Sequence, residues 1–159
     1  MMNQNSSGFL SSIPMVTKNL IIINLLFWVA SFVLPKVGID LVQLFGLHFP
    51  GVKDFYPFQF VTYMFMHDTH SFAHVLFNMF GVYMFGRVLE NVWGPKRFLT
   101  FYMVTGIGAG ITQELVWLYS VHSFASANGV TLAQLVEGDP SLNYLITIGA
   151  SGSVFGILL

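Results

Sequence analysis

The 159-residue chain contains no cysteine, and charged residues make up only 8% of it, against roughly 25% in an ordinary soluble domain. Without cysteine there is no disulfide, thiolate metal site or catalytic thiol, so any chemistry must come from Ser, His, Asp or Glu. The formal net charge of -1 lacks the basic surface that binding to nucleic acid requires. Hydrophobic residues make up 55% of the chain, a composition typical of membrane proteins.

Long apolar runs indicate an all-α, polytopic transmembrane bundle, because a spanning helix needs about 20 mostly apolar residues. The runs cover residues 19–34, 71–89 and 98–119, and the last one begins near Tyr144. We therefore expect about four spans, with residues 1–18 as a cytoplasmic N-terminal segment and residues 19–159 as one membrane domain. Residues 1–17 carry no positive charge, which favours a retained first span over a cleaved signal peptide.

Cationic loop residues predict the orientation of this multi-pass chain, because they favour the cytoplasmic side of a membrane. Lys18, Arg87, Lys96 and Arg97 fall on one side of the expected bundle, against Lys36 and Lys53 on the other. This bias places the N-terminus in the cytoplasm, and residues 36–70 and 120–143 outside. The aromatic-rich residues 36–70 suit the outer headgroup boundary, and an ordinary loop with its own small core is the alternative.

The last apolar run ends at Leu158 and Leu159 without a polar flank or a basic residue. A helix that ended there would leave up to about four unpaired carbonyls in or near hydrocarbon. Each of these would be costly if it were buried and dry. We therefore expect the membrane domain to be incomplete at its C-terminus.

Polar and small residues form a stripe along one face of the second run. Ser71, His74, Asn78 and Gly81 are spaced by three, four and three positions, which places them on one face of a helix. Polar groups at membrane depth normally face the bundle interior or a water-filled cavity, and they are functional candidates. Hydrogen bonding between helices is an equally good interpretation of His74 and Asn78 when they are considered alone.

Glycines surround one serine in the last run. Gly149, Gly152 and Gly156 lie at positions i, i+3 and i+7, which lets another helix approach closely. Ser151 lies near the expected start of this helix, where unpaired amides and the positive end of the dipole favour negative charge. A serine nucleophile needs that environment for its oxyanion, so Ser151 is the candidate nucleophile. The polar residues of the second run are candidate donors to the same oxyanion.

The other histidines have plainer interpretations. His70 and His74 are four apart, as in a helical zinc pair, but no Glu follows His70. We therefore expect no metal site and no cofactor. His67 and His70 are better explained as residues of an aqueous rim or as hydrogen-bonding groups.

Further residues of the second and third runs are expected to serve the structure. Glu90 should form an ion pair near the inner interface with Arg87 or Arg97, rather than act as a catalytic acid. Gly106 and Gly110 form a second pair suited to close helix packing.

The order of these motifs resembles that of the rhomboid family of intramembrane serine proteases. The resemblance covers roughly residues 55–110 and 147–156, and it rests on Pro57-Phe58-Gln59, Thr62, His67, His74 to Met79, Phe85-Gly86, Glu90, Gly94 and Gly149 to Gly152. It implies six core helices, of which about four are expected here, and a serine and histidine dyad that cleaves transmembrane-anchored proteins. By motif, Ser151 would be the nucleophile, and His74 and Asn78 would help to bind the oxyanion.

Two features depart from the family pattern. His67 lies seven residues before His74, which indicates a longer turn at the rim. The family's general base lies on its sixth helix, so no residue of this chain takes that role. Because general-base catalysis contributes typically about 10²- to 10⁴-fold, we expect the 159-residue chain alone to be inactive or nearly so.

The sequence thus predicts an intramembrane serine endopeptidase whose partners are transmembrane protein substrates and the lipid bilayer. The alternative is a non-catalytic rhomboid-like protein that binds transmembrane helices. A transporter fragment would show paired, repeated half-spans, and the chain contains no internal repeat. Nothing in the sequence predicts an oligomeric state.

Overall fold

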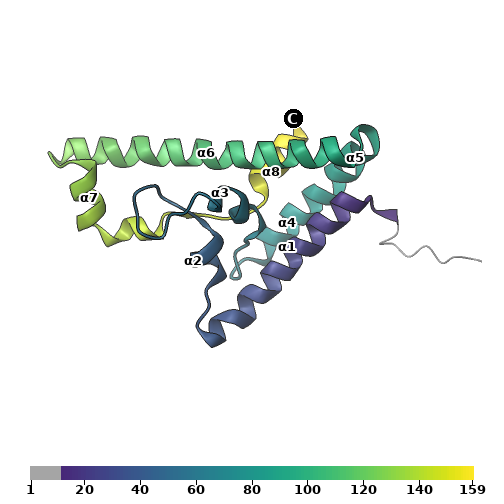
Figure 1. Cartoon of the computed structure of the whole chain (residues 1–159), viewed down its shortest axis with the longest axis horizontal. Coiled ribbons are helices and arrows are strands. Elements are labelled where there is room, and N and C mark those ends of the chain that lie inside the picture. The colour runs from purple at the N-terminus through teal and green to yellow at the C-terminus, as the bar shows by residue number, and fades with distance from the viewer. Residues whose placement is uncertain (1–11) are drawn as a thin grey trace, which may run out of the picture.

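The computed structural model describes residues 12–159 and is mostly helical (Figure 1). Its α-helices, in chain order, are α1 (Met15–Val33), α2 (Leu41–Phe45), α3 (Gln59–Thr62), α4 (Phe72–Gly81), α5 (Arg87–Trp93), α6 (Pro95–Ala127), α7 (Leu132–Gly138) and α8 (Ser151–Leu158). Shorter helical turns are η2 (Leu34–Val37), η3 (Tyr63–Phe65), the π-helical η4 (Val82–Gly86) and η5 (Pro140–Tyr144). The short strands β1 (Leu47–His48) and β2 (Ile146–Thr147) pair antiparallel.

The first two expected spans are helical in the structure. Within residues 12–159, the stretches long and apolar enough to cross a membrane are α1 with η2 and the continuous run from α4 to α5. Only 17% of the most apolar part of the first stretch is buried, and 33% of the second. Neither stretch is therefore the buried core helix of a soluble protein. Exposed side chains such as Leu26, Phe77 and Val92 give these helices apolar outer surfaces that suit lipid.

The second half of the chain differs from the expected runs. Helix α6 has 33 residues and continues into the region expected as a loop, ending before Gly129, whose φ of 69° is left-handed. Helix α8 begins at Ser151 rather than near Tyr144, because the intervening residues pair with β1. The fold is thus mostly helical rather than all-α, and neither α6 nor α8 is among the candidate spans of residues 12–159.

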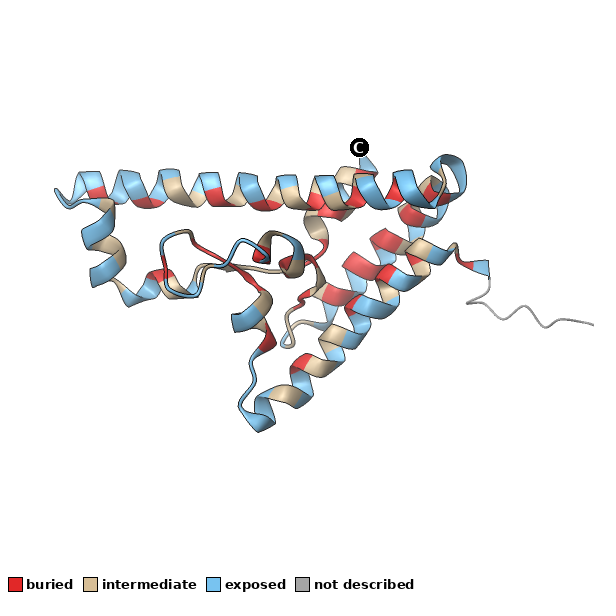
Figure 2. Ribbon diagram, in the orientation of Figure 1, coloured by how far each residue is buried: buried red, intermediate tan, exposed pale blue. Residues whose placement is uncertain are grey.

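The long helices diverge from one end of the molecule (Figure 1). Helices α1 and α6 both start near α5 and spread apart, with α4 beside α1 and α8 crossing α6. The first loop, residues 34–71, fills the space between them. Figure 2 shows buried positions of α6 on the side toward this loop and α8, and exposed positions on its opposite side.

The first loop packs buried side chains against the surrounding helices. Leu47, Phe49 and Met64 are completely buried. Gln59, also completely buried, organises the loop from within, because its Oε1 accepts from the Tyr56 amide at 3.0 Å and its Nε2 donates to the Asp54 carbonyl at 2.8 Å. Leu47, Phe49 and Met64 belong to two apolar clusters that the loop shares with α1, α4, α6, α8 and η5. The alternative interpretation of a loop with its own small core is therefore wrong for the described residues.

Small residues bring α6 and α8 into close contact, as predicted for Gly106, Gly152 and Gly156. Gly110 instead faces the first loop, and Gly149 precedes α8 and faces α4. A Cβ on Gly106 would overlap the side chains of Met64 and Ser153, and one on Gly152 would overlap Ala109. Gly156 lies equally close to Thr105 of α6. The glycines therefore set the distance between α6 and α8, and with it the position of the start of α8 relative to α6.

The structure overturns the expectation that Glu90 forms an ion pair with Arg87 or Arg97. Glu90 is 5% exposed, and its carboxylate accepts three hydrogen bonds from the first turn of α1. The donors are the amide of Val16 at 2.9 Å and the amide and hydroxyl of Thr17 at 2.7 and 2.8 Å. A carboxylate at a helix start satisfies otherwise unpaired amides and complements the dipole, so Glu90 ties α5 to α1.

Candidate functional site

The segment before Ser151 is held by the first loop. Strand pairing joins Leu47 to Thr147 and His48 to Ile146, and the Gly149 amide donates to the Tyr63 carbonyl at 2.9 Å. These long-range bonds fix the backbone that leads into α8.

Gly149 allows this segment to approach α4 closely. Its φ of 116° is a conformation that L side chains rarely adopt. A Cβ on Gly149 would lie 2.7 Å from Nε2 of His74 and 3.8 Å from Nδ2 of Asn78. The glycine therefore serves both the local backbone and the contact between two distant segments.

Ser151 is the first residue of α8 and is half-buried. No side chain caps this helix, and the first amide to bond within it is that of Val154, which donates to the Ala150 carbonyl at 2.9 Å. The amides of Ser151, Gly152 and Ser153 have no acceptor in the described part of the chain. Together with the helix dipole they form an environment that favours an anion beside the Ser151 hydroxyl.

His74 and Asn78 lie on successive turns of α4 and face the same segment. The His74 Nδ1 accepts from the Asp68 amide at 3.4 Å, so the neutral ring carries its proton on Nε2, the nitrogen nearest Gly149. Asn78 is 6% exposed, and its Nδ2 donates to the His74 carbonyl at 2.9 Å. A second amide hydrogen of Asn78 is left for another acceptor.

One cavity of about 300 Å³ brings the three candidate residues together. Its lining residues are Ala73, His74, Phe77, Asn78, Ser151, Val154 and Phe155. Gly81, the last member of the predicted stripe, packs against Val154 of α8, so the stripe faces the bundle interior. Ser71 precedes α4 and does not line the cavity.

His67 is completely buried, so it does not lie at an aqueous rim. Neither of its ring nitrogens has a hydrogen-bond partner among the described residues, so it is not a hydrogen-bonding group either. Its ring lies against that of His74, with 5.1 Å between the centroids. Burial, and then repulsion by a charge on His74, lower the pKa of His67 to about 4. His67 is therefore neutral at pH 7 and acts as an apolar-like support for the His74 ring.

The zinc alternative gains no support from the arrangement of the histidines. His70 is exposed, and its amide donates to Oδ1 of Asp68 at 2.8 Å, which closes the turn at the rim. Among the described residues there is no group of three or more His, Cys, Asp or Glu arranged to hold a metal ion.

Ser153 serves the packing of α8 and not the cavity. It is completely buried, and its hydroxyl donates to the Tyr102 carbonyl of α6 at 2.8 Å. Sequence reasoning missed Tyr63, whose carbonyl holds Gly149 and whose hydroxyl donates to the Gly106 carbonyl at 2.6 Å. No local pattern marks such a residue, because its partners lie 43 and more positions away.

Comparison with known proteins identifies the family. The family model described as the Rhomboid domain matches residues 54–159, about two thirds of the chain. The chain belongs to the rhomboid family. Rhomboid-like protein 11, chloroplastic, of Arabidopsis thaliana is 28% identical over 141 residues, which cover 84% of this chain and 40% of that relative. The chain thus spans 40% of the length of the curated relative that it matches.

Family membership confirms the resemblance that the motifs indicated. Rhomboids are membrane proteins, and the family includes serine proteases. The matched residues contain the whole cavity described above, with α4 on one wall and α8 on the other.

Proposed function

We propose that this chain carries the nucleophile and the oxyanion-binding residues of a rhomboid intramembrane serine endopeptidase that cleaves transmembrane-anchored proteins. The observation that carries the proposal is the common cavity of Ser151, His74 and Asn78, with Ser151 at the uncapped start of α8. We further infer that α6 crosses the membrane beside the two apolar stretches and that α8 lies within it. This inference follows from family membership and from their close packing.

The proposed reaction begins with addition of the Ser151 hydroxyl oxygen to the carbonyl carbon of the scissile peptide bond. The hydroxyl proton passes to a base, and the carbonyl oxygen becomes an oxyanion. The free amides at the start of α8, Nε2–H of His74 and the free amide hydrogen of Asn78 are placed to donate to it. The base then returns this proton to the peptide nitrogen, the C–N bond breaks and the amine leaves, which leaves an acyl-serine. Water hydrolyses the acyl-serine, releases the acid and restores the hydroxyl.

The proposed base is not supplied by the described residues. No described residue accepts a hydrogen bond from the Ser151 hydroxyl, and the unprotonated Nδ1 of His74 is occupied by the Asp68 amide. A serine hydroxyl without an adjacent base is a weak nucleophile. We therefore expect residues 1–159 alone to cleave substrate at a rate near background.

A fluorophosphonate probe tests the nucleophile in the complete protein, purified in bilayers. We expect Ser151→Ala to abolish labelling and Ser153→Ala to retain it, because the Ser153 hydroxyl is buried against Tyr102. The two variants remove the same group two positions apart in one helix. Labelling that persists in Ser151→Ala would exclude Ser151 as the nucleophile.

The second candidate function is non-catalytic binding of transmembrane helices. It is favoured by the apolar side chains of the cavity, Phe77, Val154 and Phe155, and by the absence of a base beside Ser151 among the described residues. This reading predicts a stable complex with a transmembrane segment, no cleavage product, and equal binding by the protein and its Ser151→Ala variant. Any Ser151-dependent product excludes it.

A further inference from the structure

A second hollow lies at the start of α6, the end of this helix that is next to α5 (Figure 1). It has a volume of about 350 Å³, and its lining residues are Lys96, Arg97, Thr100, Phe101 and Val104. These positions are i, i+1, i+4, i+5 and i+8, so they form one continuous stripe over two turns of the helix. Both cations lie at one end of the stripe and the apolar side chains at the other.

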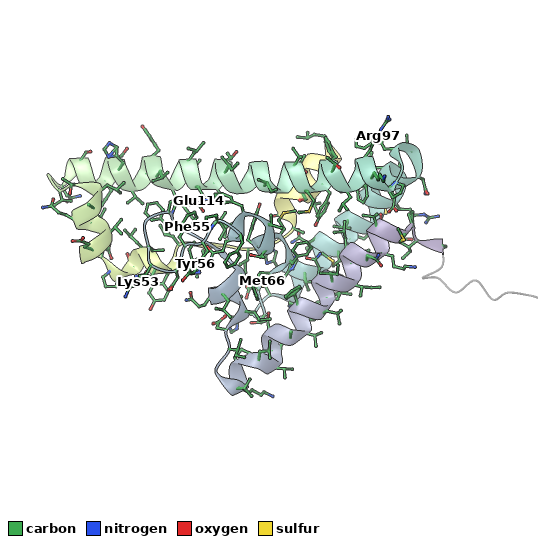
Figure 3. The ribbon with its side chains drawn as sticks, in the orientation of Figure 1. Lys53, Phe55, Tyr56, Met66, Arg97 and Glu114 are labelled. Atoms are coloured by element: carbon green, nitrogen blue, oxygen red, sulfur yellow. The ribbon has the colours of Figure 1, made fainter. Side chains whose placement is uncertain are left out.

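The two cations of this hollow have no counter-charge within residues 12–159. Neither the ammonium of Lys96 nor the guanidinium of Arg97 has a hydrogen-bond or ion-pair partner in the described residues, and both side chains are exposed. Figure 3 shows Arg97 projecting from α6 beside α5. The nearby carboxylate of Glu90 is buried and occupied by three donors of α1. An anion that pairs with Lys96 and Arg97 must therefore come from outside residues 12–159.

The apolar half of the hollow has the character of a membrane boundary. The Phe101 ring packs edge-on against Trp93, with 5.2 Å between the centroids, and Trp93 is 39% exposed. Val104, which is 61% exposed, continues the apolar wall. Tryptophan is favoured at the level of lipid headgroups, and the stripe from Lys96 to Val104 rises about 12 Å along the helix. That length reaches from a headgroup into the acyl chains.

We propose that this hollow binds an anionic phospholipid of the inner leaflet. Lys96 and Arg97 hold the phosphate, Thr100 donates to the headgroup, and Phe101 and Val104 contact an acyl chain. Arginine and lysine are the usual partners of phosphate, and an anionic lipid complements both the charge and the apolar wall. The proposal is independent of the peptidase chemistry, because no residue of the hollow lines the cavity at Ser151.

Native mass spectrometry of the complete protein tests this proposal, after equilibration with equal amounts of phosphatidylglycerol and phosphatidylcholine in micelles. We expect preferential retention of phosphatidylglycerol, and an approximately tenfold loss of that preference in the double variant Lys96→Gln/Arg97→Gln. The matched control is Lys18→Gln/Arg87→Gln, which removes two cations on the same predicted side but outside the hollow. This control should keep the preference. Circular dichroism verifies that both variants keep their helix content.

Three results would overturn the proposal. An equal loss in both double variants would indicate a diffuse electrostatic effect of the cationic side. Unchanged retention in Lys96→Gln/Arg97→Gln would mean that these cations only orient the chain in the membrane. Displacement of the lipid by millimolar glycerol phosphate would indicate a site for free phosphate. If the proposal is right, Val104→Gln should weaken lipid retention.

Discussion

Replacing Glu90 tests the link between α1 and α5 most directly. The carboxylate accepts three hydrogen bonds at 2.7 to 2.9 Å from Val16 and Thr17 while it is 5% exposed. Hydrogen bonds to a charged group contribute about 1.5–3 kcal/mol each, but their effects are not additive, and the freed amides can regain water at the end of α1. We therefore expect Glu90→Ala to lower the free energy of unfolding by about 4 kcal/mol. Glu90→Gln, which keeps one acceptor oxygen, should cost about 2 kcal/mol.

The assay is equilibrium unfolding in mixed micelles, followed by circular dichroism. Glu137→Ala is the matched control, because Glu137 is exposed in the last turn of α7 and has no hydrogen-bond or ion-pair partner in the described residues. Its effect should stay within about 0.5 kcal/mol. If Glu90→Ala also stayed within that range, the carboxylate would not hold α1, and the reasoning from its three donors would be refuted.

Three further perturbations test the site and its supports. The pKa of His67 is about 4 in the folded chain and near 6.5 in the unfolded chain, so lowering the pH from 6.5 to 4 protonates only the unfolded chain. The free energy of unfolding should therefore fall by up to about 3 kcal/mol as the pH is lowered over this range, and His67 should not affect it above pH 6.5. His67→Gln should remove this part of the pH dependence in equilibrium unfolding. Gly106→Ala should destabilise by about 1–3 kcal/mol, whereas Gly108→Ala, with open space at its Cβ, should be neutral or stabilising in the same measurement. Tyr63→Phe should cost about 1 kcal/mol and slow fluorophosphonate labelling, because it frees one tie between the first loop and α6; labelling at the unaltered rate would exclude this positioning role.

Local features of the sequence predicted the parts of the fold that depend on local physics. The first and second apolar runs appear as α1 and the run from α4 to α5, because span length follows from the transfer of consecutive apolar side chains. Helical spacing also placed Asn78 and Gly81 on the face that meets α8. Motif order indicated the family, which the domain match confirms.

Other boundaries did not follow from composition. Polar residues after Ser120 suggested a loop, but α6 continues to Ala127, because polar side chains on an exposed helix face do not by themselves end a helix. The last apolar run suggested a helix from Tyr144, but Ile146 and Thr147 pair with a strand about a hundred positions earlier in the chain. Such pairing is set by tertiary contacts and has no signature within the run itself.

The sequence by itself determined that Ser151 sits among glycines and that His74 and Asn78 share a helix face, since both statements depend only on spacing. Only the tertiary structure decided which groups meet. Gly149 contacts His74 because the Tyr63 carbonyl holds its amide. The Glu90 carboxylate bonds α1 across 73 positions instead of pairing with Arg87 or Arg97, which lie three and seven positions away. The physical reason is that hydrogen bonds and close packing act over a few ångströms in space, whatever the separation along the chain.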